Sequence, residues 1–375
     1  MNIRSPQPGD CIQDLDTPTV LVDLDRMEKN IRQWQSCIQD RGVKFRPHIK
    51  THKVPEIALL QIAAGARGII AAKISEAEPF AEAGITDICI AYPVFGEVKW
   101  KRVAELAKRG VRVTVNCDSE DAAQGLSKAA RDARVTIHVQ VDVDSGFHRG
   151  GVPMQDIASI ERLARGIKNL PGLEFDGLTT FRAIGFAGAI NPIDAGHDEG
   201  QLLTEIADKL RDAGIGIHEV TAGSTPTAKW AGEVEGVTEV RAGTYVFNDL
   251  MQLGNKVVSE DELALSVLCT VVSHQTSDRL TIDGGSKTFS GDVGKVAAGV
   301  SVPTIARALE RRIFVERLTE EHGMARTEEP VKLGEKIHFV PYHVCTCVNL
   351  SDEIVGCRGD RVEVVWPVRA RGLRA

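Results

Sequence analysis

The chain has 375 residues, a length that predicts two domains or one large barrel with a smaller unit. Its 45 basic and 52 acidic side chains give a net charge of −7, which argues against a nucleic-acid-binding protein. No window approaches about 18 consecutive apolar residues, and residues 1–6 lack the apolar core of a signal peptide. We therefore expect a cytoplasmic enzyme without a membrane segment, whose eight cysteines are reduced thiols.

The first two thirds of the sequence alternate between short apolar runs and helix-like segments. One run, 135–143, alternates valines with polar residues and ends in acids, as expected for a strand whose inner face lies near a barrel mouth. About eight β–α units follow one another, which predicts an α/β fold with a closed (β/α)8 barrel over 18–254. An open, doubly wound sheet is the alternative. The predicted strands lie at 18–24, 43–49, 69–73, 88–92, 112–116, 135–143, 173–180, 218–222 and 237–245.

After residue 255 the pattern changes to strands joined by glycine-containing loops. The pattern predicts strands at 264–272, 279–283, 336–344 and 361–368, and one helix near 302–311. We expect a β-rich second domain formed by residues 1–17 and 255–375.

A basic segment, Arg46-Pro-His-Ile-Lys-Thr-His-Lys53, follows the second predicted strand. Lys50 would then point into the barrel mouth. A lysine that is flanked by cations and partly desolvated has a lowered pKa and acts as a nucleophilic amine. A solvated basic loop is the alternative interpretation.

Three further segments could bind an anion. Gly223-Ser224-Thr225 follows a predicted strand, where backbone amides and hydroxyls suit a phosphate, although an ordinary capped turn fits the pattern as well. Residues 243–245 end the last barrel strand, and the Tyr245 hydroxyl could reach the same phosphate. Arg149 lies after the acid-tipped strand, where it could pair with a phenolate or carboxylate, or be a solvated surface residue.

The predicted strand that ends near residue 344 leads into a pair of metal-binding residue types. His343 and Cys345 are two positions apart, so on a strand they would project from one side, and Cys347 would share that side. A nitrogen and a sulfur ligand favour Zn²⁺. A strand with buried cysteines is the alternative.

Taken together, these segments resemble the D-serine dehydratase/D-threonine aldolase family, whose members use pyridoxal phosphate and share the alanine racemase-like fold. The resemblance spans nearly the whole chain. It depends on Asp16-Thr17-Pro18, residues 46–53, Gly223-Ser224-Thr225, Gly243-Thr244-Tyr245 and His343-x-Cys345.

The resemblance implies a role for each of these residues. Lys50 would bind the cofactor aldehyde through its amine, and Arg149 would lie near the phenolic oxygen of the cofactor. Phe181 could stack on the cofactor, although relatives often carry Gln and Tyr where this chain has Thr179-Thr180-Phe181. His343 and Cys345 would bind a divalent metal, with zinc preferred over manganese. The cofactor phosphate would be held by Gly223, Ser224, Thr225, Gly243 and Tyr245. His48, His52, Asp283 and His322 receive no role.

The implied activity is that of a metal-assisted lyase acting as a homodimer on a small D-3-hydroxy amino acid. Loss of the β-hydroxyl would give a keto acid and ammonia, whereas Cα–Cβ cleavage would give glycine and an aldehyde. The His-x-Cys pair favours elimination, because aldolase relatives usually carry His-x-Asp. A racemase and a non-catalytic pyridoxal-phosphate-binding barrel are the rival interpretations. The substrate itself is left open among D-serine, D-threonine, 3-hydroxy-D-aspartate and β-phenylserine.

Overall fold

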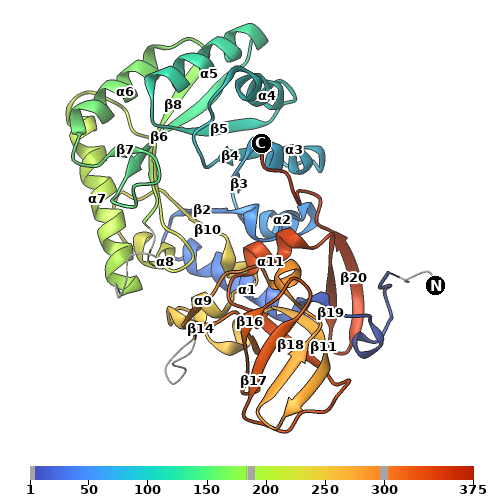
Figure 1. The fold of residues 1–375 in the computed structure, drawn as a ribbon. Helices are drawn as coiled ribbons and strands as arrows, with labels where there is room; N and C mark the ends of the chain where they lie inside the picture. Colours follow the sequence, from blue (N-terminus) through green and yellow to red (C-terminus); the bar gives the residue numbers. More distant parts are fainter. Residues whose placement is uncertain (1–4, 183, 185–190, 296–302) are drawn as a thin grey trace. The chain divides into compact units, whose positions relative to one another are not determined.

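A computed structural model describes residues 5–182, 184, 191–295 and 303–375. The chain divides into two compact units, whose elements are labelled in Figure 1. The barrel unit comprises Gln33–Lys50, Pro55–Gly243 and Leu373–Ala375, and the β unit comprises Met1–Arg32, Thr51–Val54 and Thr244–Gly372. The predicted domain bounds of 18–254 and of 1–17 with 255–375 stay predictions.

The barrel unit is built on parallel strands. Their order is β2-β10-β9-β8-β6-β5-β4-β3 among the described residues, and a bridge between His48 and Ile70 links the two ends of the series. The result is the expected nearly closed eight-stranded barrel. Its strands are β2 (Lys44–Pro47), β3 (Ile69–Ala71), β4 (Asp87–Ile90), β5 (Arg112–Cys117), β6 (Ile137–Asp144), β8 (Leu173–Thr180), β9 (Glu219–Ala222) and β10 (Glu239–Ala242), with the short β7 (Val152–Pro153) beside β6.

Helices alternate with these strands because the intervening segments carry caps and apolar faces. Ser119 caps α5 by accepting a hydrogen bond from the Ala122 amide, and Asp156 caps α6 through the Ser159 amide. The helices are α1 (Leu24–Gln39), α2 (Pro55–Ala63), α3 (Ile74–Glu82), α4 (Glu97–Lys108), α5 (Glu120–Ala133), α6 (Ile157–Asn169), α7 (Pro192–Asp212) and α8 (Ala228–Ala231).

The alternation in β6 has the predicted meaning. Val139, Val141 and Val143 are buried, while Gln140 donates a 3.2 Å hydrogen bond to Thr221 of β9, which is not adjacent to β6 in the sheet. The polar row therefore faces the barrel interior and leads toward the carboxyl ends of the strands, where barrel active sites lie.

The β unit contains a mixed sheet in the order β12-β17-β16-β15-β18-β11-β1-β19-β20. Its strands are β1 (Thr19–Asp23), β11 (Leu265–Thr276), β12 (Arg279–Ile282), β15 (Ala306–Ala308), β16 (Ile313–Leu318), β17 (Gly323–Thr327), β18 (Lys336–Pro341), β19 (Glu353–Arg358) and β20 (Arg361–Pro367), and β13 (Gly294–Lys295) pairs with β14 (Pro303–Thr304). The short helices are η1 (Ile12–Asp14), η3 (Thr244–Val246), α9 (Leu250–Gly254), η4 (Glu260–Glu262), α10 (Ser286–Phe289) and α11 (Val344–Leu350), and η2 (Ile49–Thr51) spans the boundary between the two units.

Two predictions are wrong, one about a strand and one about a helix. The run at 18–24 does not open the barrel, because β1 pairs antiparallel with β11 and parallel with β19. Val20, Leu21 and Val22 are all buried there, so a central strand of this sheet has the same apolar pattern as a barrel strand. The helix expected near 302–311 is replaced, over the described residues 303–311, by β14 and β15.

Over the described residues, no helix combines the length and the apolar character needed to span a membrane.

Candidate active site

Lys50 lies in the turn that follows β2, and His48 fixes this turn. The backbone N–H of Lys50 donates to His48 Nδ1 at 3.3 Å, and the His48 amide donates to the Ala242 carbonyl at 2.8 Å. Burial lowers the pKa of His48 well below its usual value. Three cations lower it further, namely Lys50, Arg241 and Arg149. His48 is therefore a neutral positioning residue, and the cations around it make this end of the barrel suitable for an anionic ligand.

The predicted phosphate loop follows β9. Gly223 has a φ of +93°, and a Cβ there would lie 2.7 Å from the Ala228 Cα, so only glycine fits. The Ser224 amide donates to Thr227 Oγ1 at 2.9 Å, and the Ala228 amide donates to the Ser224 carbonyl at 2.8 Å. This tight turn presents Ser224 and Thr225 at the end of the strand, an arrangement that suits a phosphate group.

The remaining predicted phosphate ligands are divided between the two units. Gly243 ends the barrel unit directly after β10, whereas Tyr245 belongs to the β unit, where it is buried in η3. The structure thus groups Gly223, Ser224, Thr225 and Gly243 in one unit and leaves the part of Tyr245 a proposal.

Arg149 is exposed, and its guanidinium packs against aromatic side chains. Its guanidinium carbon lies 4.6 Å from the Tyr92 ring centre and 4.9 Å from that of Phe181, and the guanidinium donates to the Tyr92 hydroxyl at 3.2 Å. Phe181 also meets Phe147 edge to face at 5.7 Å. Cation–π contacts of this kind hold a guanidinium in place. Phe181, which we expected to stack on the cofactor, contacts Arg149.

No individual role was predicted from the sequence for Arg241 on β10 or for Asp142, which belongs to the polar row of β6. Arg241 is buried and donates to the Thr180 carbonyl. Burial raises the pKa of Asp142 to about 6, although Arg241 and Arg149 act in the opposite direction. The available signal was a charged side chain near the carboxyl end of each strand, which indicates a polar interior or a ligand.

His343 and Cys345 do not lie on a strand, so the reason given for their proximity is wrong. β18 ends at Pro341, His343 is the N-cap residue of α11, and Cys345 lies in the first turn of this helix. The two side chains are nevertheless hydrogen-bonded to one another. Cys347 is two positions further along α11 and therefore projects from a different side of the helix; it is fully buried, and burial raises its pKa to about 12.

Acidic groups surround the imidazole of His343. Nδ1 lies 2.8 Å from Asp292 Oδ2, which also accepts a 2.8 Å hydrogen bond from the Thr346 hydroxyl. Burial opposes protonation of His343, but Cys345, Asp249 and Asp292 raise its pKa to about 10. A carboxylate on one imidazole nitrogen and a thiol near the ring is an arrangement that fits a transition metal.

Another group with metal-ligand chemistry lies at the opposite end of the barrel strands. Among the described residues, His138, Glu174 and Asp176 place ligand atoms within 4.8 Å of one another. Arg112 donates to Asp176 at 2.8 Å and lies 3.2 Å from His138 Nδ1, so a cation already pairs with one carboxylate of this group. We interpret it as an ion-pair network at the start of β6 and β8.

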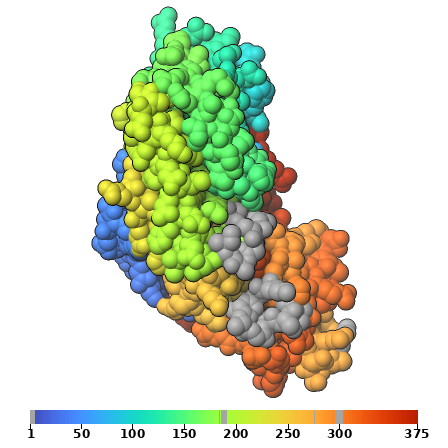
Figure 2. All heavy atoms as spheres, turned by 90° about the vertical axis from the view of Figure 1, so that its left-hand side faces the viewer, coloured from blue at the N-terminus to red at the C-terminus, as the bar shows by residue number. Residues whose placement is uncertain are grey.

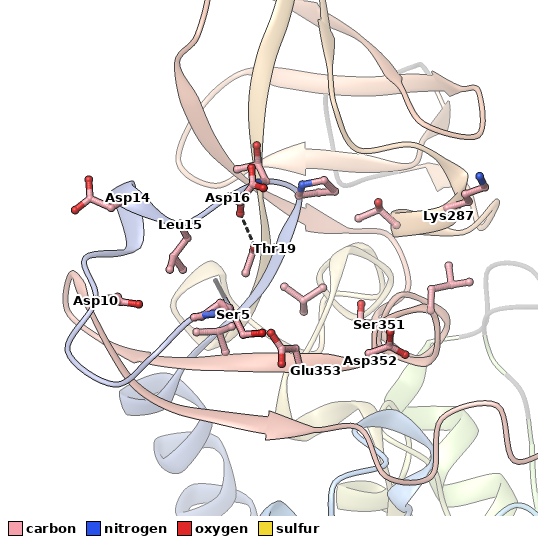
Figure 3. Close-up of a pocket in the computed structure, with 17 residues that line it drawn as sticks. Ser5, Asp10, Asp14, Leu15, Asp16, Thr19, Lys287, Ser351, Asp352 and Glu353 are labelled. Atoms are coloured by element: carbon pink, nitrogen blue, oxygen red, sulfur yellow. Dashed lines mark hydrogen bonds between the residues drawn. The ribbon is translucent and has the colours of Figure 1, made fainter. Parts of the chain in front are cut away.

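A pocket of about 930 Å³ lies in the β unit. Figure 3 draws the residues that line it. Its charged lining is mostly acidic and contains none of the predicted site residues. Carboxylates repel a phosphate, so this pocket does not suit the expected cofactor. The charged side chains are Asp10, Asp14, Asp16, Asp352, Glu353 and Lys287.

The other residues without an expected role make structural contacts in the β unit. His52 is buried and its Nδ1 accepts a 3.1 Å hydrogen bond from the Val54 amide. Asp283 accepts a 2.8 Å hydrogen bond from the Thr270 amide. His322 is exposed, and its backbone amide donates to Thr319 Oγ1 at 3.2 Å.

Comparison with known proteins supports the family suggested by these residues. Residues 22–250 match the alanine racemase N-terminal domain, and residues 264–357 match a serine dehydratase domain. A D-threonine aldolase from Arthrobacter sp. is 34% identical over 98% of this chain and 96% of its own length. The chain belongs to the D-serine dehydratase/D-threonine aldolase family.

Other members of the family agree in sequence and fold. A D-threo-3-hydroxyaspartate dehydratase from Delftia sp. is 33% identical over 90% of this chain and 92% of its own. The crystal structure of a D-threonine aldolase from Filomicrobium marinum has a TM-score of 0.89 and 30% identity, covering 99% of this chain and all of that one. The expected alanine racemase-like fold is confirmed, and the close relatives are pyridoxal-phosphate-dependent lyases.

Proposed function

We propose that this chain is a pyridoxal-phosphate- and metal-dependent lyase that removes water from a D-3-hydroxy amino acid. The observation that supports this most directly is that neutral His48 holds the turn carrying Lys50 and is itself surrounded by the charges of Lys50, Arg241 and Arg149. Lys50 would hold the cofactor covalently through its amine, and the loop at 223–225 would bind its phosphate. When bound, pyridoxal phosphate supplies an electron sink for a carbanion at Cα. Buried Arg241 and exposed Arg149 would hold the anionic cofactor and orient it in the barrel mouth.

His343 and Cys345 would hold a divalent metal that assists departure of the substrate hydroxyl. A nitrogen and a sulfur donor favour zinc, with manganese the alternative. Solved structures of D-threo-3-hydroxyaspartate dehydratase include a cysteine-to-alanine variant in the metal-free form and a histidine-to-alanine variant, with the two substituted positions two residues apart. The same spacing separates His343 and Cys345. Asp292 would orient the His343 imidazole toward the metal.

Cleavage to glycine and an aldehyde is the second candidate activity. Relatives of similar identity carry both kinds of name, an aldolase at 34% and a dehydratase at 33%. The cysteine ligand favours elimination, which is why we place it first. We further propose that the enzyme is cytoplasmic and works as a homodimer. Sedimentation of the purified protein would test the dimer.

Two measurements test the proposal. Borohydride treatment of the purified protein, followed by peptide mass spectrometry, is expected to find the reduced cofactor on Lys50 and on no other lysine. Lys50→Ala is the control, and an unlabelled wild-type peptide would contradict the assignment.

The second measurement incubates the enzyme with D-serine, D-threonine, 3-hydroxy-D-aspartate and β-phenylserine. Keto acid with ammonia is expected. Glycine with aldehyde as the only products would replace elimination by retro-aldol cleavage.

A further inference from the structure

A fully buried carboxylate, Glu199, lies behind the predicted phosphate loop. It is carried by α7, whose yellow-green atoms form part of the face of the barrel unit seen in Figure 2. Oε2 accepts a 2.9 Å hydrogen bond from the Thr227 hydroxyl, and Oε1 accepts a 3.0 Å hydrogen bond from the Arg182 amide. The Gly223 backbone also bonds to this carboxylate. All three partners are donors, so a single side chain joins the segments that follow β8 and β9.

Two glycines beside Glu199 allow this close approach. A Cβ on Gly196 would lie 2.6 Å from the Thr227 carbonyl oxygen, and one on Gly200 would lie 2.8 Å from Val234 Cγ2. The backbone of α7 is therefore pressed against residues 227–234, and the carboxylate reaches the loop from behind. Burying a carboxylate without hydrogen-bond donors costs several kcal/mol. The three donors around Glu199 offset this cost.

The carboxylate sets the direction of the hydrogen bonds in the loop. Thr227 has one hydroxyl proton, and it is donated to Glu199, so Thr227 Oγ1 is left to accept from the Ser224 amide at 2.9 Å. Ser224 Oγ also lies 2.9 Å from Thr227 Oγ1. Loss of the acceptor at Glu199 would release Thr227, and with it the turn that presents Ser224.

We infer that Glu199 is a positioning residue for the cofactor phosphate, which holds the 223–227 loop in the shape that receives it. This inference rests on the proposed function. It also assigns a purpose to the spacing Gly196-x-x-Glu199-Gly200, which the sequence alone does not explain.

The test compares two ligands that differ only in the phosphate. Full-length protein freed of cofactor is titrated with pyridoxal phosphate and with pyridoxal, and binding is followed by absorbance. Glu199→Gln is expected to raise the Kd for pyridoxal phosphate ~10-fold, a change of ~1.4 kcal/mol, and the Kd for pyridoxal less than ~2-fold. Thr227→Val, which removes the intervening hydroxyl, is expected to give the same selective loss. It also serves as the second variant if Glu199→Gln does not fold.

Glu219→Gln is the matched control, because it alters another buried carboxylate at the opposite end of β9. It is expected to leave the ratio of the two Kd values unchanged. Equal weakening of both ligands by Glu199→Gln, or a wild-type ratio, would overturn the inference while the proposed function stands. If the wild-type protein shows no preference for the phosphorylated ligand and no adduct on Lys50, the proposed function fails and this inference fails with it.

Discussion

Asp142 is a carboxylate placed where the barrel interior disfavours its charge. Burial raises its pKa to about 6, above the value near 4 of an unfolded chain, so the folded protein binds the proton more tightly. Stability therefore decreases as pH rises from about 4 to about 6, and the deficit is complete above that range. Asp142→Asn is expected to stabilise the cofactor-free protein by roughly 1–3 kcal/mol at about pH 7.5 and by little at about pH 4. Thermal unfolding at both pH values measures this, and an equal shift at both would contradict it.

Cys345 and Cys347 offer a matched pair at the proposed metal site. The Cys345 side chain is hydrogen-bonded to His343. The Cys347 side chain is fully buried on a different side of the helix, and burial raises its pKa to about 12. Cys345→Ser is expected to weaken zinc binding by more than ~10-fold, and Cys347→Ser to leave the zinc content unchanged. Elemental analysis of the purified variants gives the answer. A metal content unaffected by Cys345→Ser would remove this residue from the ligand set.

At the scale of single elements, β8 depends on one glycine. Gly177 has a φ of +151°, and a Cβ there would lie 1.9 Å from the Glu219 carbonyl oxygen on β9. Gly177→Ala is expected to destabilise the protein by about 3 kcal/mol or more, because the clash is with backbone. Gly166 within α6 has open space around it, and Gly166→Ala is expected to stabilise by about 0.5–1 kcal/mol. Urea unfolding of both variants tests the contrast, and similar effects at the two sites would contradict it.

The barrel strands were predictable because their apolar runs recur between amphipathic helices with recognisable caps. β1 was also predicted as a strand, but the sheet to which it belongs was not predictable, since a strand covered on both faces has the same pattern in either sheet. The helix at 344–350 was also missed, because its valines, threonine and cysteines favour strands. Asp249, almost a hundred positions earlier, accepts a 3.2 Å hydrogen bond from the Val344 amide at the helix start. Tertiary contacts of this kind leave no local signal.

Some residues of the candidate site could be predicted from the sequence, and one could not. Lys50 and the 223–225 loop stand in motifs that the sequence displays, and the family resemblance supplied their chemistry. Glu199 lies within a long polar helix, where a glutamate ordinarily faces solvent, and only the structure shows that it is buried.

At the scale of the molecule, the proposed cofactor and metal residues belong to different compact units. Lys50 is in the barrel unit, and His343 and Cys345 are in the β unit. A chelator is therefore expected to abolish lyase activity while leaving the absorbance of bound cofactor intact, and added Zn²⁺ should restore turnover. Absorbance and product formation, measured on one sample, distinguish loss of the cofactor from loss of turnover. Loss of the chromophore together with the metal would show that the cofactor needs the ion to bind.

The place of β1 between β11 and β19 has a consequence for synthesis on the ribosome. Its partners at 265–268 and 355–357 emerge long after residues 19–23, so the strand must stay unpaired through most of translation. Residues 373–375 also join the barrel unit, where the Ser75 amide donates to the Ala375 carbonyl at 3.0 Å. A nascent chain halted near residue 260 would contain every barrel strand, but both edges of the apolar strand β1 would still be unpaired. Such fragments are expected to aggregate or to bind chaperones, whereas the full-length chain can pair and bury β1.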